Sequence, residues 1–177
     1  MTSPQKCGFV AVIGPPNAGK STLSNALVGQ KVAIVTQKAQ TTRMRLRAVV
    51  MHQQSQIILV DTPGIFEAKQ RFDRAMVNEA WLGVNDADQV LVVLDAQRAE
   101  TPEVDLMLDG LARSEKRVSL VLNKIDTVPH ESLLALVQKL NERVAFADTF
   151  LISALKGHGL SEVRDQLAAS MPEGPWP

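Results

Sequence analysis

The stretch GPPNAGKST, Gly14 to Thr22, decides the fold of this chain. It follows an apolar run, CGFVAVI, and precedes a helix-like run, LSNALVG. Residues 14–21 fit the pattern G-x-x-x-x-G-K-[ST], in which backbone N–H groups and a helix N-terminus surround phosphate oxygens. We expect Lys20 to reach the β and γ phosphates of a nucleotide and the Ser21 hydroxyl to ligate Mg²⁺. The prolines and the asparagine are unusual, because such loops generally use flexible backbone.

Short apolar runs alternate with amphipathic segments along the rest of the chain. Six runs are expected to be strands: 9–13, 46–51, 56–61, 89–95, 117–123 and 149–153. Most are β-branched and continuous, which is typical of strands covered on both faces. The second and third are separated only by a few residues around HQQS, which is too short for a crossover helix, so we predict an antiparallel hairpin there.

Apolar residues at three- and four-residue spacings predict helices between the strands. The expected helices cover residues 71–86, 102–114, 133–144 and 160–171. Thr101 followed by Pro102 is a start signal for the second of them. The alternation indicates an α/β fold with a mostly parallel six-stranded sheet, one antiparallel strand and helices on both faces. Residues 30–45 and 63–72 fit neither pattern and are interpreted as functional loops.

Composition narrows the class of protein. The chain has 177 residues, enough for one domain with a sizeable core. Lys+Arg and Asp+Glu are 19 each, so bulk charge does not indicate binding to nucleic acid or membrane. The single cysteine excludes a disulfide framework and favours a reducing cytosol.

The tetrapeptide DTPG, Asp61 to Gly64, closes the third expected strand. Asp61 can hold Mg²⁺ through water, and the Gly64 N–H can approach a terminal phosphate. A metal-binding threonine is expected in QTTR: we favour Thr42 as the Mg²⁺ ligand, with Thr41 as the alternative. A loop held in this way is ordered by the γ-phosphate and released after hydrolysis.

The tetrapeptide NKID, Asn123 to Asp126, predicts which base is bound. The Asp126 carboxylate can accept hydrogen bonds from guanine N1–H and its 2-amino group, and adenine offers neither. Asn123 can tie this segment to the phosphate loop, and the stem of Lys124 can cover one face of the base. SAL, at the end of the sixth expected strand, can donate to guanine O6 through the N–H of Ala154.

Taken in order, GPPNAGKST, KAQTTR, DTPG, NKID and SA resemble the small bacterial GTPases of the Era family over essentially the whole chain. The resemblance implies a P-loop NTPase G domain at residues 1–172, with 173–177 as the start of a linker to a KH domain that this chain lacks. Pro15 and Ala18 replace the Arg and Val of the usual GRPNVGKS.

The family implies a cytoplasmic enzyme that hydrolyses GTP to GDP and phosphate, with Mg²⁺ and slow intrinsic turnover. It further implies a role in small ribosomal subunit assembly, with 16S rRNA and the 30S subunit as partners, and a peripheral contact with the inner membrane. The isolated domain is expected to be a monomer. The nucleotide contacts are expected from Gly14, Pro15, Pro16, Asn17, Ala18, Gly19, Lys20, Ser21, Thr22, Thr42, Asp61, Gly64, Asn123, Lys124, Asp126, Ser153, Ala154 and Leu155.

Catalysis is expected to use Lys20, Thr42, Gly64 and Asn17. Ras-like enzymes orient water with a glutamine after Asp-x-x-Gly, but this chain has Ile65 there. By similarity to GTPases with a Pro-x-Asn loop, Asn17 is a candidate K⁺ ligand near the β–γ bridge. The alternative is that Asn17 only shapes the loop.

Three other functions are compared with this prediction. A P-loop kinase would need an acceptor pocket and an arginine-rich lid, for which the chain has no spare segment. A nucleic-acid-binding module is disfavoured by the neutral charge and by the lack of an aromatic-basic pattern. A related GTPase of tRNA modification or large-subunit assembly is the closest alternative. Arg43, Arg45 and Arg47 are interpreted as a solvated strand edge.

Overall fold

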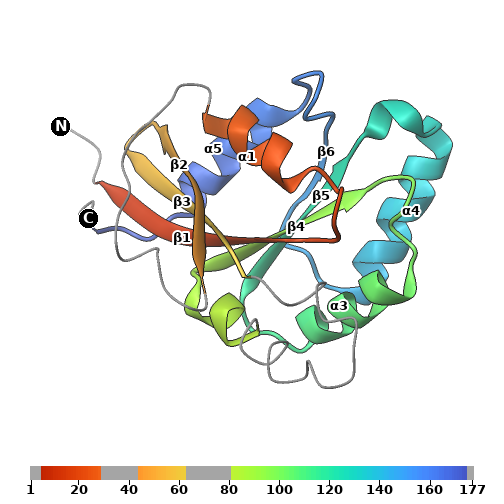
Figure 1. The fold of residues 1–177 in the computed structure, drawn as a ribbon, viewed down its shortest axis with the longest axis horizontal. Coiled ribbons are helices and arrows are strands. Elements are labelled where there is room, and N and C mark those ends of the chain that lie inside the picture. The colour runs from red at the N-terminus through yellow and green to blue at the C-terminus, as the bar shows by residue number, and fades with distance from the viewer. Residues whose placement is uncertain (1–4, 29–43, 63–80, 175–177) are drawn as a thin grey trace.

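Six strands form one sheet in the order β2-β3-β1-β4-β5-β6 (Figure 1). The computed structural model describes residues 5–28, 44–62 and 81–174. The strands are β1 Lys6–Ile13, β2 Arg45–His52, β3 Ser55–Asp61, β4 Gln89–Asp95, β5 Arg117–Asn123 and β6 Thr149–Leu151. Each of the six expected strands is confirmed, although β6 ends two residues earlier than the apolar run.

The pairing of the strands is parallel except at one edge. β1 pairs in parallel with β3 and β4, β4 with β5, and β5 with β6. β2 pairs antiparallel with β3, which confirms the predicted hairpin. The chain passes to one side of β1 and then crosses to the other, so the carboxyl end of β1 is the switch point where open α/β sheets bind ligands.

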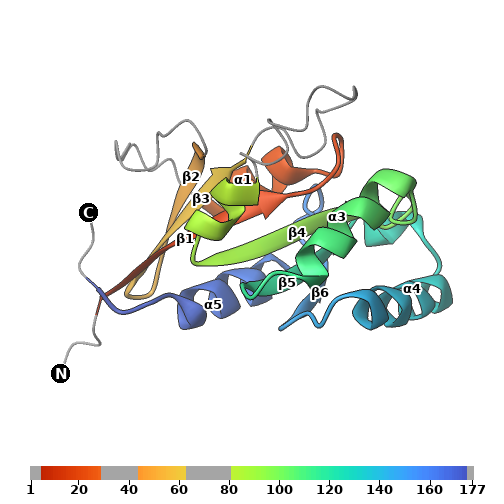
Figure 2. The same cartoon turned by 90° about the horizontal axis from the view of Figure 1, so that it is seen from below.

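Helices cover both faces of this sheet (Figures 1 and 2). They are α1 Lys20–Val28, α3 Pro102–Ala112, α4 His130–Arg143 and α5 Leu160–Ser170, with a short 3₁₀ turn, η3, at Ile125–Thr127. Residues 81–86 are also helical, which agrees with part of the expected helix 71–86; the rest of that helix lies outside the described residues. The Thr101 hydroxyl accepts from the Val104 N–H at 3.2 Å and caps α3 as predicted.

Most of the two expected loops, 30–45 and 63–72, also lies outside the described residues. Arg45 is an exception, because it is the first residue of β2 and not part of a loop. Within the three described ranges, none of the helices combines the length and the apolar character needed to cross a membrane.

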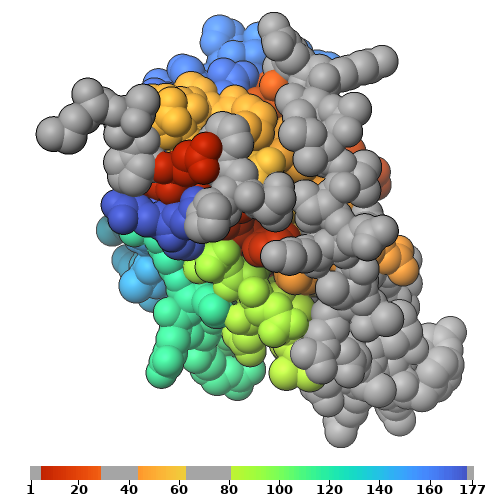
Figure 3. All heavy atoms as spheres, turned by 90° about the vertical axis from the view of Figure 1, so that its left-hand side faces the viewer, coloured from red at the N-terminus to blue at the C-terminus, as the bar shows by residue number. Residues whose placement is uncertain are grey.

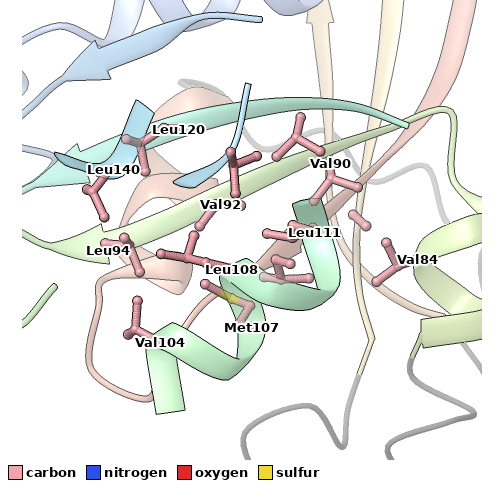
Figure 4. Packing of buried hydrophobic residues seen from close by; sticks show 14 of the residues in the cluster. Val84, Val90, Val92, Leu94, Val104, Met107, Leu108, Leu111, Leu120 and Leu140 are labelled. Atoms are coloured by element: carbon pink, nitrogen blue, oxygen red, sulfur yellow. The ribbon is translucent and has the colours of Figure 1, made fainter. Parts of the chain in front are cut away.

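Apolar side chains form a core on each side of the sheet. On one side, α3 packs on β4 and β5 through residues such as Leu108, Leu111 and Leu120 (Figure 4). On the other side, α1 and α5 pack through residues such as Leu23 and Val163. These strands are buried on both faces because both faces are covered, which explains their continuous apolar runs.

The C-terminal segment is bound to the start of β1. The Cys7 N–H donates to the Pro172 carbonyl at 3.0 Å, and the Gly174 N–H donates to the Gln5 carbonyl at 3.1 Å. Figure 3 shows this end of the molecule, with the last described residues beside the first residues of β1. The two described ends of the chain therefore lie together, opposite the edge that carries the loop after β1.

Candidate nucleotide-binding site

The two prolines and the asparagine of the loop after β1 build a tight turn. The Ala18 N–H donates to the Pro15 carbonyl at 3.3 Å, so residues 15–18 form a β-turn. Pro16 is its second residue and Asn17, with φ of 67°, its third. Proline and a left-handed residue at these two places are the signature of a type II turn, and asparagine tolerates that conformation better than most residues.

Two glycines in the same loop are required by close packing. A Cβ on Gly14 would lie 2.1 Å from the carbonyl oxygen of Val93 in β4. Gly19 has φ of 100°, and a Cβ there would lie 2.2 Å from Nδ2 of Asn123. The backbone of the loop can therefore approach β4 and β5 only because both residues lack a side chain.

Lys20 begins α1 and folds back over the loop. Its ammonium donates to the carbonyls of Gly14 and Pro15, the latter at 3.0 Å. The predicted reach of Lys20 to phosphate is untested, but the side chain already lies on the inner surface of the loop.

Asn123, at the end of β5, connects three segments of the site. Its Nδ2 donates to the Ala18 carbonyl at 2.9 Å, which is the expected tie to the phosphate loop. Its Oδ1 accepts from the N–H groups of Lys124 at 2.9 Å and Ala154 at 3.0 Å. The Ala154 N–H, expected to donate to guanine O6, is thus engaged by Asn123 here.

Lys124 turns its side chain toward the loop. Its ammonium donates to the Asn17 carbonyl at 2.8 Å and pairs with Asp95 at 3.1 Å. Asp95 was missed in the sequence, although an acidic residue at the end of β4 belongs to the same sheet edge. These contacts hold the turn against β4 and β5, beside a cavity of about 580 Å³ lined by the loop and the start of α3.

Asp126 forms an ion pair with Lys156, a contact that its motif does not predict. The Lys156 ammonium lies 3.3 Å from Asp126 Oδ2 and lowers the pKa of that carboxyl, and a side-chain hydrogen bond with Ser153 lowers it further. Ser153 lies past the end of β6, in the turn that leads to α5. Leu155 is 89% exposed.

The two predicted Mg²⁺ ligands with described positions face each other across Arg47. The Arg47 guanidinium donates to Ser21 Oγ at 3.1 Å and lies 3.5 Å from Asp61 Oδ2. A hydroxyl and a carboxylate that share one cation have the oxygen donors that Mg²⁺ takes, so the pair fits this metal. β2 is an edge strand and Arg45 is exposed, as expected. The prediction that Arg47 is solvated is wrong, because its side chain is only 18% exposed.

Several expected site residues cannot be placed. Thr41, Thr42, Gly64 and Ile65 lie outside the described residues. The other predicted residues lie at the carboxyl end of the sheet, because β1, β3 and β5 are parallel and all end there.

Comparison with known proteins agrees with this geometry. Residues 9–124 match the model of the family described as 50S ribosome-binding GTPase. GTPase Era of Afipia carboxidovorans is 54% identical over 173 residues, which cover 98% of this chain and 56% of that protein. The chain therefore spans little more than half the length of this relative.

Two solved structures share the fold. A single-residue variant of Aquifex aeolicus Era bound to GDP·AlF4⁻ is 36% identical, with a TM-score of 0.76 over 98% of this chain and 60% of that one. Era in complex with MgGDPNP and nucleotides 1506-1542 of 16S ribosomal RNA is 37% identical, with a TM-score of 0.78 over 98% of this chain and 59% of that one.

Proposed function

Because this chain belongs to the 50S ribosome-binding GTPase family, we propose that it is the G domain of an Era-type GTPase, which binds and hydrolyses GTP. The observation that carries the proposal is the linkage of NKID to the phosphate loop through Asn123 and Lys124. We assign the G domain to residues 1–172, with 173–177 starting a linker. The hydrogen bond between Cys7 and Pro172 supports including residue 172, and the one between Gly174 and Gln5 extends this attachment to residue 174.

Specificity for guanine rests on Asp126 in this proposal. Its carboxylate accepts from guanine N1–H and the 2-amino group, and adenine would leave it without those partners. The lowered pKa of Asp126 supports this role, because only the ionised carboxylate offers acceptors on both oxygens.

The chain's own residues bind and orient the triphosphate. The loop N–H groups and the start of α1 hold the phosphates, and Lys20 contacts the β and γ oxygens. Ser21, Asp61 and Thr42 would hold Mg²⁺, which neutralises charge on the β and γ phosphates when bound. Gly64 would donate its N–H to the γ-phosphate, and Asn17 would hold K⁺ near the β–γ bridge.

The biological role proposed for the whole protein is small ribosomal subunit assembly. Support comes from the similarity to Era, one structure of which holds a fragment of 16S ribosomal RNA. The family description names the 50S ribosome instead, so the choice of the small subunit rests on the similarity to Era. This partner would place the protein in the cytoplasm, and none of the described residues supports the expected membrane contact.

The test is phosphate release from GTP and from ATP, in the wild type and in Asp126→Asn. The wild type should hydrolyse GTP only, and Asp126→Asn should lose GTP affinity by roughly tenfold or more, because the amide repels the guanine donors. Asp148→Asn is the matched control: Asp148 pairs with Arg117 at 2.9 Å but lies before β6, at the opposite edge of the sheet.

Equal use of ATP would contradict guanine specificity and favour the kinase alternative. Loss of GTP turnover in both variants would show that the effect is on folding and not on base recognition.

A further inference from the structure

Among the residues that the structure describes, Arg47 is the one charged side chain that reaches both Ser21 and Asp61. Its Nη1 lies 3.1 Å from Ser21 Oγ and its Nη2 lies 3.5 Å from Asp61 Oδ2. Ser21 is at the start of α1 and Asp61 at the end of β3, so a single guanidinium joins two elements. Its positive charge therefore lies between the two side chains that would hold Mg²⁺, Ser21 through its hydroxyl and Asp61 through water.

A β-bulge puts Arg47 there. The pairing of β2 with β3 shifts between Leu46 and Ala48, so Arg47 is an extra residue with no partner of its own in the register of β3. Leu46 packs in the core beside α3, whereas Ala48 packs in the core beside α1 and α5. In a regular strand these two side chains would share a face, and the bulge is what redirects the segment.

The contact is not that of an optimally satisfied structural arginine. The Nε of Arg47 is buried and makes no hydrogen bond within the described part of the chain. Buried arginine donors are normally paired, and an unpaired one calls for a functional explanation. The guanidinium is thus attracted to this site by the charge of Asp61, but its hydrogen bonds there are incomplete.

We propose that Arg47 competes with Mg²⁺ for Ser21 and Asp61, and so sets the affinity of the G domain for the metal. The inference rests on the proposed function. Without metal, the guanidinium compensates the charge of Asp61. When Mg²⁺ binds, Arg47 would withdraw, because its guanidinium hydrogen-bonds the Ser21 hydroxyl that the metal would take, and two cations so close together repel each other. Its charge nearby continues to weaken the metal site.

The experiment measures Mg²⁺ affinity and not turnover. The chain is loaded with a fluorescent methylanthraniloyl derivative of GDP. The rate of nucleotide release is then measured at increasing Mg²⁺ concentrations. In Arg47→Gln, the Mg²⁺ concentration that gives half of the change in release rate should fall by about tenfold. The substitution removes a positive charge that lies several ångströms from the metal and is only partly screened by solvent. Arg117→Gln is the matched control, because Arg117 lies at the start of β5 and pairs with Asp148, at the end of the sheet opposite to Asp61.

The outcomes separate the inference from the proposed function. Tighter Mg²⁺ binding in Arg47→Gln alone supports the competition. Equal Mg²⁺ affinity in the wild type and Arg47→Gln overturns it, and so does weaker binding, which would make Arg47 a support of the metal site. Absence of guanine nucleotide binding in the wild type would overturn the proposed function itself.

A second measurement covers the case in which Arg47→Gln does not fold. The Nε–H signal of Arg47 is followed by NMR in the wild-type chain with GDP, and it is assigned by its loss in Arg47→Lys. Adding Mg²⁺ should shift this signal and speed its exchange with water, because the guanidinium leaves its buried position. A signal that Mg²⁺ leaves unchanged overturns the proposal.

Discussion

At the scale of single residues, Asn17 has two separable features. Its backbone has φ of 67° at the third position of the turn, and its exposed side chain is the proposed K⁺ ligand. Asparagine is well suited to the first feature, so its presence alone does not demonstrate the second. A substitution to alanine removes both together, whereas glycine keeps the turn and removes only the side chain.

We therefore predict that Asn17→Gly retains the fold but loses stimulation of GTP hydrolysis by K⁺. Asn17→Ala should lose it too and be less stable by about 1 kcal/mol, because alanine is strained at positive φ. Phosphate release is measured in KCl and in NaCl at equal ionic strength, and stability by urea unfolding. If Asn17→Gly keeps its K⁺ stimulation, the side chain only shapes the loop.

The Lys156–Asp126 pair makes a pH-dependent prediction. The folded pKa of Asp126 is lowered, so the pair stabilises the fold above the ordinary carboxyl pKa, and this contribution is lost as pH falls through the lowered value. Lys156→Gln should raise the pKa of Asp126 toward its ordinary value, so the contribution should become smaller and its loss should be complete at a higher pH.

The measurement is an NMR titration of the Asp126 carboxyl carbon in both proteins. Lys139→Gln is the control, since Lys139 pairs with Glu100 at 3.4 Å on the surface and does not contact Asp126. An unchanged pKa in Lys156→Gln would mean that Ser153 and the local backbone, and not Lys156, set the charge state of Asp126.

At the scale of elements, α3 has one buried face and one exposed face. Leu108 packs against β4 and β5 (Figure 4) and is 1% exposed. Leu106, two positions earlier, is 72% exposed. Residues two apart lie on different sides of a helix, so the same residue type meets two environments.

Leu108→Ala should destabilise the chain by about 2–5 kcal/mol, because a cavity opens in a close-packed core. Leu106→Ala should change the free energy of unfolding by no more than about 0.5 kcal/mol. Urea unfolding of both variants checks the prediction. Equal losses would mean that Leu106 is covered in solution by a partner or by a second copy of the chain.

At the scale of the whole molecule, the sheet order brings the motifs together. The loop after β1, Asp61 at the end of β3 and NKID at the end of β5 are far apart in sequence, yet all lie at one edge because their strands are parallel. The C-terminal segment is bound to the start of β1, at the opposite end. The last described residues therefore lie at the end of the domain opposite to the nucleotide site.

Much of this arrangement is readable from the sequence because its determinants are local. Continuous β-branched runs specify covered strands, four residues between two runs specify a hairpin, and Thr101 with Pro102 specifies the start of α3. The motifs from Gly14 to Ala154 are recognised in the same way, since their chemistry depends on residue type and on short spacings.

Only the tertiary structure decided the contacts made across the site. The sequence predicts that Arg47 is an exposed residue of an edge strand. Its contact with Ser21 and Asp61 depends on a β-bulge that the local sequence does not predict. Lys156 meets Asp126, and Asn123 engages Ala154, because separate strands end side by side. Such pairings depend on register and packing between distant segments, so the sequence determined which groups are available, and the folded sheet determined which of them meet.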